Sequence, residues 1–177
     1  MVFSKKTTQE IKLNETAEQI ANIEYQNLVK IAEILKEIAD LAGKARNPAD
    51  YPTLRPAIKD RIFQLWEKLN IALKAMEYGD KLMQASFALE KKFKFGGEAK
   101  AVRKMAIILT KDIFNNLNEQ LKHRYPLLQM RASGQNFKEI QTMAENMRTH
   151  IGTIAQYVLK LKQLEARIEE FYRRNKM

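Results

Sequence analysis

The feature that most constrains the fold is a run of side chains near the end of the chain, spaced alternately three and four residues apart. Eleven positions follow this spacing and ten of them are apolar. They are Phe137, Ile140, Ala144, Met147, Ile151, Ile154, Val158, Leu161, Glu165, Ile168 and Tyr172. Such spacing over about five heptads places one apolar seam along a helix, as in a coiled coil. The segment therefore predicts a helix over residues 136–174, with Asn136 and Glu139 as capping residues, that buries its seam against other helices.

A second long helix is predicted near the start of the chain. Apolar residues recur at helical spacing from Ile11 to Ala42, and the capping-box sequence Thr7-Thr8-Gln9-Glu10 precedes them. Gly43 is a natural stop, so the helix is expected over residues 8–42. The stretch from Asn47 to Pro56 holds three of the four prolines and predicts a loop.

Two more helices are expected between this loop and the last segment. The first covers residues 54–95, with Pro56 in its first turn, and ends before Gly96-Gly97. The second covers residues 98–124, and Pro126 is expected to end or kink the chain at Tyr125. Its apolar positions are Val102, Met105, Ile108, Leu109, Ile113, Leu117 and Leu121.

Composition favours a single all-α domain over residues 1–177. Six glycines and four prolines are few for a β-sandwich or barrel, which needs many turns. Long helices with short links pack antiparallel. We therefore expect an elongated antiparallel bundle of three long helices (8–42, 54–95 and 136–174), with a fourth helix (98–124) packed alongside.

The sequence contains no pattern typical of a catalytic or metal site. Cysteine is absent, which removes disulfides, thiolate zinc sites and cysteine nucleophiles. The two histidines, His123 and His150, are not part of any Glu-x-x-His or His-Glu-x-x-His motif, and both are expected at the surface. Trp66 and the eight methionines follow core spacing. We therefore expect no metal, no cofactor and no enzymatic activity.

The chain is basic, with 31 Lys and Arg against 21 Asp and Glu and a net charge of +10. One stretch concentrates cations and aromatic rings around a glycine bend, and it is the candidate contact surface. Its members are Lys91, Lys92, Phe93, Lys94, Phe95, Lys100, Arg103 and Lys104. Interleaved cations and aromatics suit nucleic acid or anionic lipid. The alternative is a hairpin in which Phe93 and Phe95 close the bundle end while the lysines stay in solvent.

The order of features along the chain resembles the minor pilin family of type IV secretion systems, particularly its conjugative-transfer branch. Val2-Phe3 precedes a polar first helix containing Gln19-Ile20-Ala21-Asn22-Ile23-Glu24-Tyr25-Gln26-Asn27-Leu28. Ala75-Met76-Glu77-Tyr78-Gly79-Asp80-Lys81-Leu82, with Phe87 and Phe93, is similar to a mid-chain segment before a glycine-containing bend. Arg131-Ala132-Ser133-Gly134-Gln135 opens a Gln- and Leu-rich last helix that runs through Leu159-Lys160-Leu161-Lys162-Gln163-Leu164-Glu165-Ala166.

The resemblance implies a non-enzymatic component of a secretion or conjugation apparatus. Its partners would be the major pilin and inner-membrane subunits of the apparatus, and the family role needs no active site. Independently of the resemblance, the seam of the last helix can close within one subunit or between two copies in an oligomer. The first eight residues lack the apolar region of a secretory signal. We expect a periplasmic or cell-surface location if the chain is a signal-stripped mature domain, and a cytoplasmic one otherwise.

Overall fold

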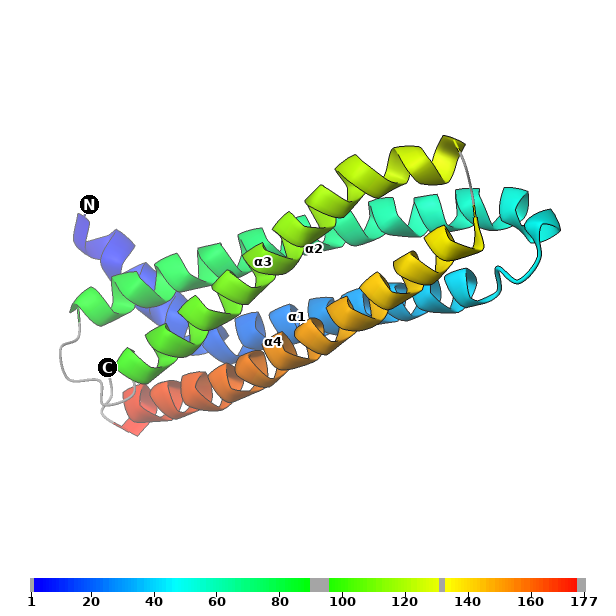
Figure 1. Cartoon of the computed structure of the whole chain (residues 1–177). Helices are drawn as coiled ribbons and strands as arrows, with labels where there is room; N and C mark the ends of the chain where they lie inside the picture. Colours follow the sequence, from blue (N-terminus) through cyan, green and yellow to red (C-terminus); the bar gives the residue numbers. More distant parts are fainter. Residues whose placement is uncertain (1, 90–95, 131–132, 175–177) are drawn as a thin grey trace.

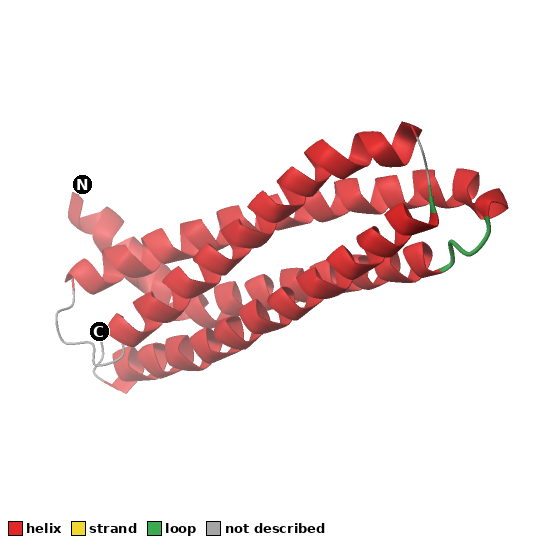
Figure 2. Ribbon diagram, in the orientation of Figure 1, coloured by secondary structure: helices red, strands yellow, loops and turns green. Residues whose placement is uncertain are grey.

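The computed structural model describes residues 2–89, 96–130 and 133–174 of the chain. Side-chain burial is described from residue 19 onward, except at residues 83, 85–96, 121, 123–132, 168–169 and 171–172. Four long helices, α1 (Val2–Gly43), α2 (Tyr51–Leu89), α3 (Gly96–Met130) and α4 (Gly134–Arg174), are joined by short connections. The first connection contains a short 3-10 helix, η1 (Pro48–Asp50). The described part of the chain contains no strand, and the prediction of an all-α fold is confirmed (Figure 2).

The four helices form an elongated bundle in which consecutive helices run antiparallel (Figure 1). Each helix packs against its neighbours in sequence, and α4 closes the ring by packing against α1. Because the directions alternate, the start of α1 and the end of α4 lie at the same end of the bundle. The four helices have similar lengths of 35 to 42 residues. α3 is therefore one of the four sides of the bundle, whereas the sequence analysis expected a shorter helix packed alongside three long ones.

The seam predicted for the last helix lies in the core. All its members from Phe137 to Glu165 are buried. The α1 seam follows the same spacing through Leu28, Ile31, Leu35 and Ile38, each at most 1% exposed. Regular 3–4 spacing keeps one face of each helix turned inward along the bundle, which is why periodicity located these residues correctly.

The helix limits differ from the prediction at several ends. α1 starts at Val2, so the capping-box sequence at Thr7 lies inside the helix instead of at its start. α2 starts at Tyr51, which places Pro56 beyond the first turn. The cap of α4 is Ser133, whose Oγ accepts a hydrogen bond from the Asn136 backbone N–H at 3.3 Å. Asn136 therefore follows the cap.

The third helix departs most from the sequence expectation. It continues through Pro126 to Met130, so the proline does not end it near Tyr125. The inward face is also different. Met105 and Ile108 are 41% and 42% exposed, while Ala99, Ala106 and Thr110 are fully buried. Val102, Ile113 and Leu117 are buried as predicted. The apolar pattern therefore located this face in part, and it failed where the buried residues are small or polar and larger apolar residues lie outside.

Candidate functional sites

The core of the bundle contains an ion-paired cluster formed by residues from three helices. Arg103 of α3 donates from Nη1 to Glu24 Oε1 of α1 at 2.7 Å. Its Nη2 donates to Glu165 Oε1 of α4 at 2.6 Å. The three side chains are at most 2% exposed. We call this cluster, together with Gly79 of α2, the charge node.

Gly79 gives the Arg103 guanidinium its space. A Cβ atom at this position would lie 2.6 Å from Arg103 Nη1, 3.0 Å from Arg103 Cζ and 3.0 Å from Glu24 Oε1. Real Cβ atoms do not approach other heavy atoms within 3.0 Å, so an L side chain at this position requires the ion pair to move. All four helices therefore meet at the node, three with charged groups and α2 with a glycine.

The node carries two carboxylates for one guanidinium. Burial alone would lower the pKa of Arg103, but attraction to Glu24 and Glu165 outweighs burial and raises the pKa above its ordinary value. Arg103 therefore stays charged. For Glu24, burial raises the pKa above 4.5, against the opposing attraction and hydrogen bond from Arg103. The attraction and hydrogen bond from Arg103 do not offset the loss of water around the Glu24 carboxylate.

Sequence reasoning missed this cluster, although two of its members interrupt otherwise apolar seams. Glu165 is the one non-apolar residue among the eleven seam positions of the last helix. Glu24 lies at seam spacing between Ala21 and Leu28 in the first helix. Charged residues at seam positions were the available signal that a buried ion pair existed.

The three residues of the predicted contact surface that the structure describes differ in exposure. Lys100 and Lys104 are exposed, as expected for a surface. Arg103 is 1% exposed, so its assignment to the contact surface is wrong: its guanidinium is engaged by Glu24 and Glu165 in the core. The remaining five candidates, Lys91, Lys92, Phe93, Lys94 and Phe95, lie outside the described residues.

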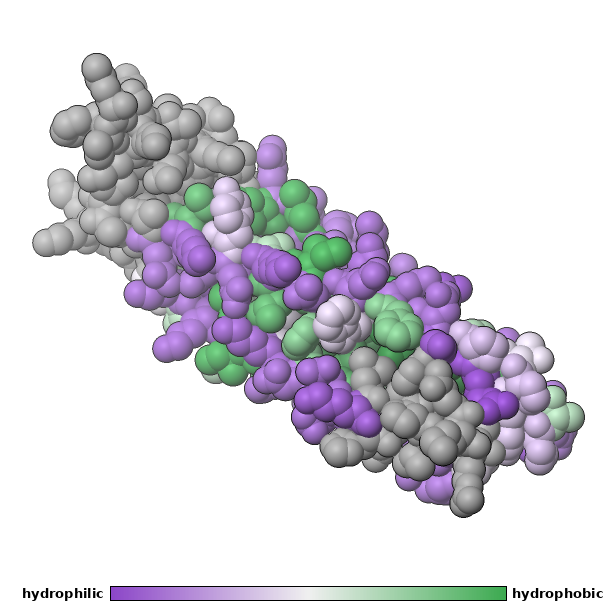
Figure 3. Space-filling model, turned by 90° about the horizontal axis from the view of Figure 1, so that it is seen from above, coloured by the Kyte–Doolittle hydropathy of each residue, from purple (hydrophilic) through white to green (hydrophobic). Residues whose placement is uncertain are grey.

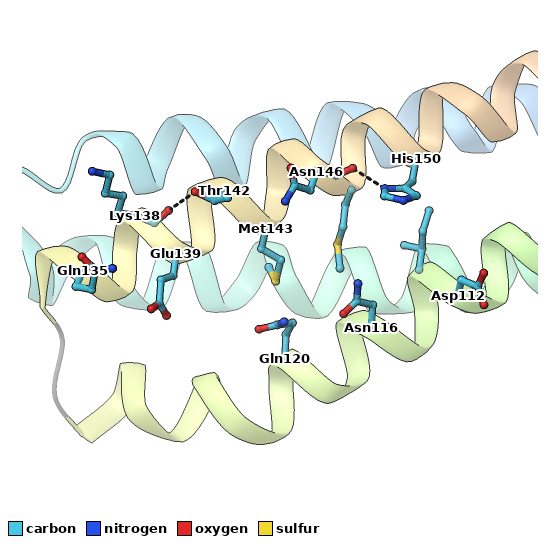
Figure 4. Close-up of a pocket in the computed structure, with 12 residues that line it drawn as sticks. Asp112, Asn116, Gln120, Gln135, Lys138, Glu139, Thr142, Met143, Asn146 and His150 are labelled. Carbon is cyan, nitrogen blue, oxygen red and sulfur yellow. Dashed lines mark hydrogen bonds between the residues drawn. The ribbon is translucent and has the colours of Figure 1, made fainter.

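A cleft of about 400 Å³ lies between the second half of α3 and the first half of α4. Figure 4 shows Asn116 and Gln120 of α3 directed toward Met143 of α4 across it. His150 lies at one end and is exposed, as expected, and its Nδ1 lies 2.8 Å from the Asn146 carbonyl oxygen. A carbonyl oxygen accepts, so Nδ1 is the donor, and in the neutral imidazole Nε2 is then an acceptor. The polar side chains of the cleft can therefore hydrogen-bond a ligand.

The described residues contain no group of three or more His, Cys, Asp or Glu side chains that could hold a metal ion. The side chain of His123 lies outside the described residues. Within the described helices, no stretch is long and apolar enough to cross a membrane.

Several large apolar side chains face outward on the bundle. Ile23 of α1 is 58% exposed, and Ile71 and Tyr78 of α2 are each 53% exposed. Ile23 precedes Glu24 and Tyr78 precedes Gly79, and Glu24 and Gly79 meet at the charge node. Ile23 and Tyr78 therefore lie at the same level of the bundle on adjacent helices. Seen from above Figure 1, apolar groups are interspersed with polar ones over the surface (Figure 3).

Comparison with known proteins finds no matching family model, no matching curated protein and no matching solved structure.

Proposed function

We propose that this protein is a non-enzymatic, minor-pilin-like component of a type IV secretion or conjugation apparatus that acts through protein–protein contact. The family assignment in this proposal rests on the resemblance in feature order along the chain. Contact as the mode of action is supported by the exposed apolar side chains.

The observation that carries the contact role is the exposure of Ile23, Ile71 and Tyr78, each more than half exposed. Exposed apolar side chains that lie close together mark interaction sites, and Ile23 and Tyr78 lie at the same level of adjacent helices. Tyrosine is also enriched in interface cores. The two isoleucines and the tyrosine belong to α1 and α2, whose backbones are fixed by a packed core. A rigid helical surface of this kind suits docking onto a second protein without folding on binding.

The proposal is tested in cells that encode the protein by placing a photocrosslinking amino acid at position 78. The matched control places it at Gln156, which is exposed on α4. We expect the position-78 variant to crosslink to the major pilin or to an inner-membrane subunit of the apparatus, and the position-156 variant to give no such product. Tyr78→Asp should reduce DNA or effector transfer by at least about tenfold, the effect of losing a contact worth ~1.4 kcal/mol, while Gln156→Asp should not.

Two results would overturn the proposal. One is normal transfer in cells from which the gene has been deleted. The other is normal transfer with Tyr78→Asp, together with the absence of any crosslink to the apparatus from position 78.

Binding of nucleic acid, or of an anionic membrane, through the basic stretch remains the alternative prediction. Arg103 no longer belongs to that surface, and Lys100 and Lys104 are its exposed members among the described residues. Nucleic-acid binding through these lysines would weaken steeply with salt. A gel shift at two salt concentrations, with Lys100→Glu/Lys104→Glu as the variant, distinguishes this alternative from the proposed function. Co-sedimentation with acidic and neutral vesicles tests the membrane form.

A further inference from the structure

We propose that the cleft between α3 and α4 binds a linear aliphatic polyamine, with its amines on acceptors toward both ends of the cleft and its methylene chain along an apolar floor. The cleft volume of about 400 Å³ falls within the range of roughly 300–1,000 Å³ that is typical of small-molecule sites. This inference goes beyond the proposed function, whose contact residues Ile23, Ile71 and Tyr78 lie on α1 and α2.

Two α4 side chains that line the cleft use their donors within the helix. The Thr142 hydroxyl donates to the Lys138 carbonyl oxygen at 3.0 Å. His150 donates from Nδ1 to the Asn146 carbonyl oxygen at 2.8 Å. A hydroxyl oxygen keeps lone pairs after it has donated, and Nε2 of a neutral imidazole with the proton on Nδ1 is an acceptor. Thr142 Oγ1 and His150 Nε2 can therefore accept hydrogen bonds from a ligand.

The α3 side of the cleft contains an acceptor that lacks a partner. Gln120 Oε1 is buried and has no hydrogen-bond partner among the described residues. A buried acceptor without a partner costs free energy, which a donor on a ligand recovers. The Gln120 side chain as a whole is half-buried and is directed toward Met143 across the cleft (Figure 4). Rotation of its terminal amide therefore brings Oε1 to a donor placed in the cleft.

The charged side chains of the cleft favour a cation as the donor. Asp112 and Glu139 contribute two carboxylates, and Lys138 contributes one ammonium group among the described lining residues. With His150 neutral, the lining has an excess of one negative charge, although the whole chain carries +10. An alkylammonium group has three donors and no acceptor, so it suits both the carboxylates and the acceptors described above.

The length of the cleft and its floor favour a linear ligand with more than one amine. Asp112 and Gln120 lie eight residues apart on α3, a rise of about 12 Å along the helix. Figure 4 shows Asp112 and His150 toward one end of the cleft, with Gln120 farther along it. Met143 and Met147 of α4 line the stretch between them, and Met147 is only 4% exposed. Methylene groups between two amines fit this apolar stretch, whereas a compact cation leaves it uncovered.

Spermidine, a linear triamine with methylene spacers, is the probe for the first test on the whole chain. Calorimetry and ¹H–¹⁵N correlation spectra are recorded in a low-salt buffer above neutral pH. We expect saturable binding with a Kd below about 1 mM. The signals that shift should be those of the cleft, including the side-chain amides of Asn116, Gln120 and Asn146. Binding that does not saturate by about 10 mM, or shifts spread equally over all four helices, would overturn the proposal.

A lysine side chain of a protein partner offers the same ammonium chemistry but only one amine. n-Butylamine, with one amine on a four-carbon chain, represents this source. It should bind at least about tenfold more weakly than spermidine, because it can reach the acceptors at only one end of the cleft. Equal affinity for the two probes would show that the cleft takes a single ammonium group and would overturn the assignment to a polyamine.

Asp112→Asn tests the role of the cleft carboxylate. Losing a charge-assisted hydrogen bond should weaken spermidine binding at least about tenfold. Glu119→Gln is the matched control, because it removes the same charge from the same helix at an exposed side chain that pairs with Lys122 at 3.6 Å. This variant should change the Kd by less than about twofold. Equal weakening in both variants would show that spermidine responds to overall charge and not to the cleft.

Gln120→Leu separates ligand binding from folding. Leucine is close to glutamine in size but has no acceptor that needs a partner, so the urea midpoint of this variant should equal or exceed that of the wild type. Spermidine binding should nevertheless weaken at least about threefold, because one hydrogen bond to the ligand is lost. Wild-type affinity in Gln120→Leu would show that the buried acceptor does not contact the ligand and would contradict the proposed site.

Discussion

Replacing Gly79 by alanine should destabilise the bundle, although the same change ordinarily stabilises a helix. Alanine is favoured over glycine in a helix interior by about 1 kcal/mol. At Gly79 the new Cβ would lie 2.6 Å from Arg103 Nη1 and 3.0 Å from Glu24 Oε1. Overpacking a filled core costs about 1–3 kcal/mol, and breaking a buried ion pair about 3–5 kcal/mol. After subtraction of the helix preference, we expect a net loss of about 2 kcal/mol or more.

Gly152→Ala is the control for this experiment. A Cβ at Gly152 on α4 would have no heavy atom within 4 Å, so only the helix preference applies. We expect this variant to gain up to about 1 kcal/mol. Urea unfolding followed by circular dichroism at 222 nm measures both changes. A loss of about 2 kcal/mol corresponds to a fall in Tm of about 4–8 °C for a domain of this size.

A double variant tests whether the Arg103 guanidinium causes the loss of stability in Gly79→Ala. An Arg103→Met background has no guanidinium at position 103. The methyl group that Gly79→Ala adds then has no ion pair to displace, and the flexible methionine side chain can move away from it. The cost of Gly79→Ala should therefore shrink by more than half. If Gly79→Ala stabilises the wild type as much as Gly152→Ala does, the close fit between Gly79 and the node would be refuted.

Two further predictions concern the core. Arg103→Ala removes the guanidinium that pairs with two buried carboxylates and should cost about 3–5 kcal/mol of stability. The triple change Glu24→Leu/Arg103→Met/Glu165→Leu should instead be neutral or stabilising by about 1–4 kcal/mol. Urea unfolding measures both, and equal losses of stability would contradict the burial of the ion pair. Leu161→Asp places an unpaired charge at a fully buried seam position and should unfold the chain, while Ile108→Asp, at a position 42% exposed, should change stability by no more than about 0.5 kcal/mol. Circular dichroism with gel filtration checks this pair, and a folded Leu161→Asp variant of half the native mass would show that two copies share the seam.

Periodicity in the sequence was sufficient to predict the helices and two of the seams. Long aliphatic residues at 3–4 spacing, such as Leu28 in α1 and Ile154 in α4, can be buried in only one way in an antiparallel bundle. On α3 the pattern is only partly present: Val102, Ile113 and Leu117 are buried as predicted. Between them, Ala106 and Thr110 are buried while Met105 and Ile108 are exposed, so a prediction guided by side-chain size assigned these two large residues to the wrong face.

The charge node could not be derived from local sequence. Arg103 lies 79 residues from Glu24 and 62 residues from Glu165, so only the packing of the helices brings the three together. Its neighbours Lys100 and Lys104 are exposed, and a cation in a basic stretch is ordinarily solvated. The interruption of the α4 seam by Glu165 indicated a buried acid, but the sequence did not identify its partner.

The measurement that tests the buried ion pair most directly is ¹⁵N NMR of the arginine guanidinium groups at neutral pH, with Arg103→Lys used for assignment. If Arg103 is clamped between Glu24 and Glu165, its Nη–H protons should give separate signals that exchange slowly with water. Arg173 and Arg174 on the exposed end of α4 are the internal reference and should give averaged, rapidly exchanging signals. An Arg103 signal as averaged as theirs would show that the guanidinium is free in solvent and that no charge node joins the helices.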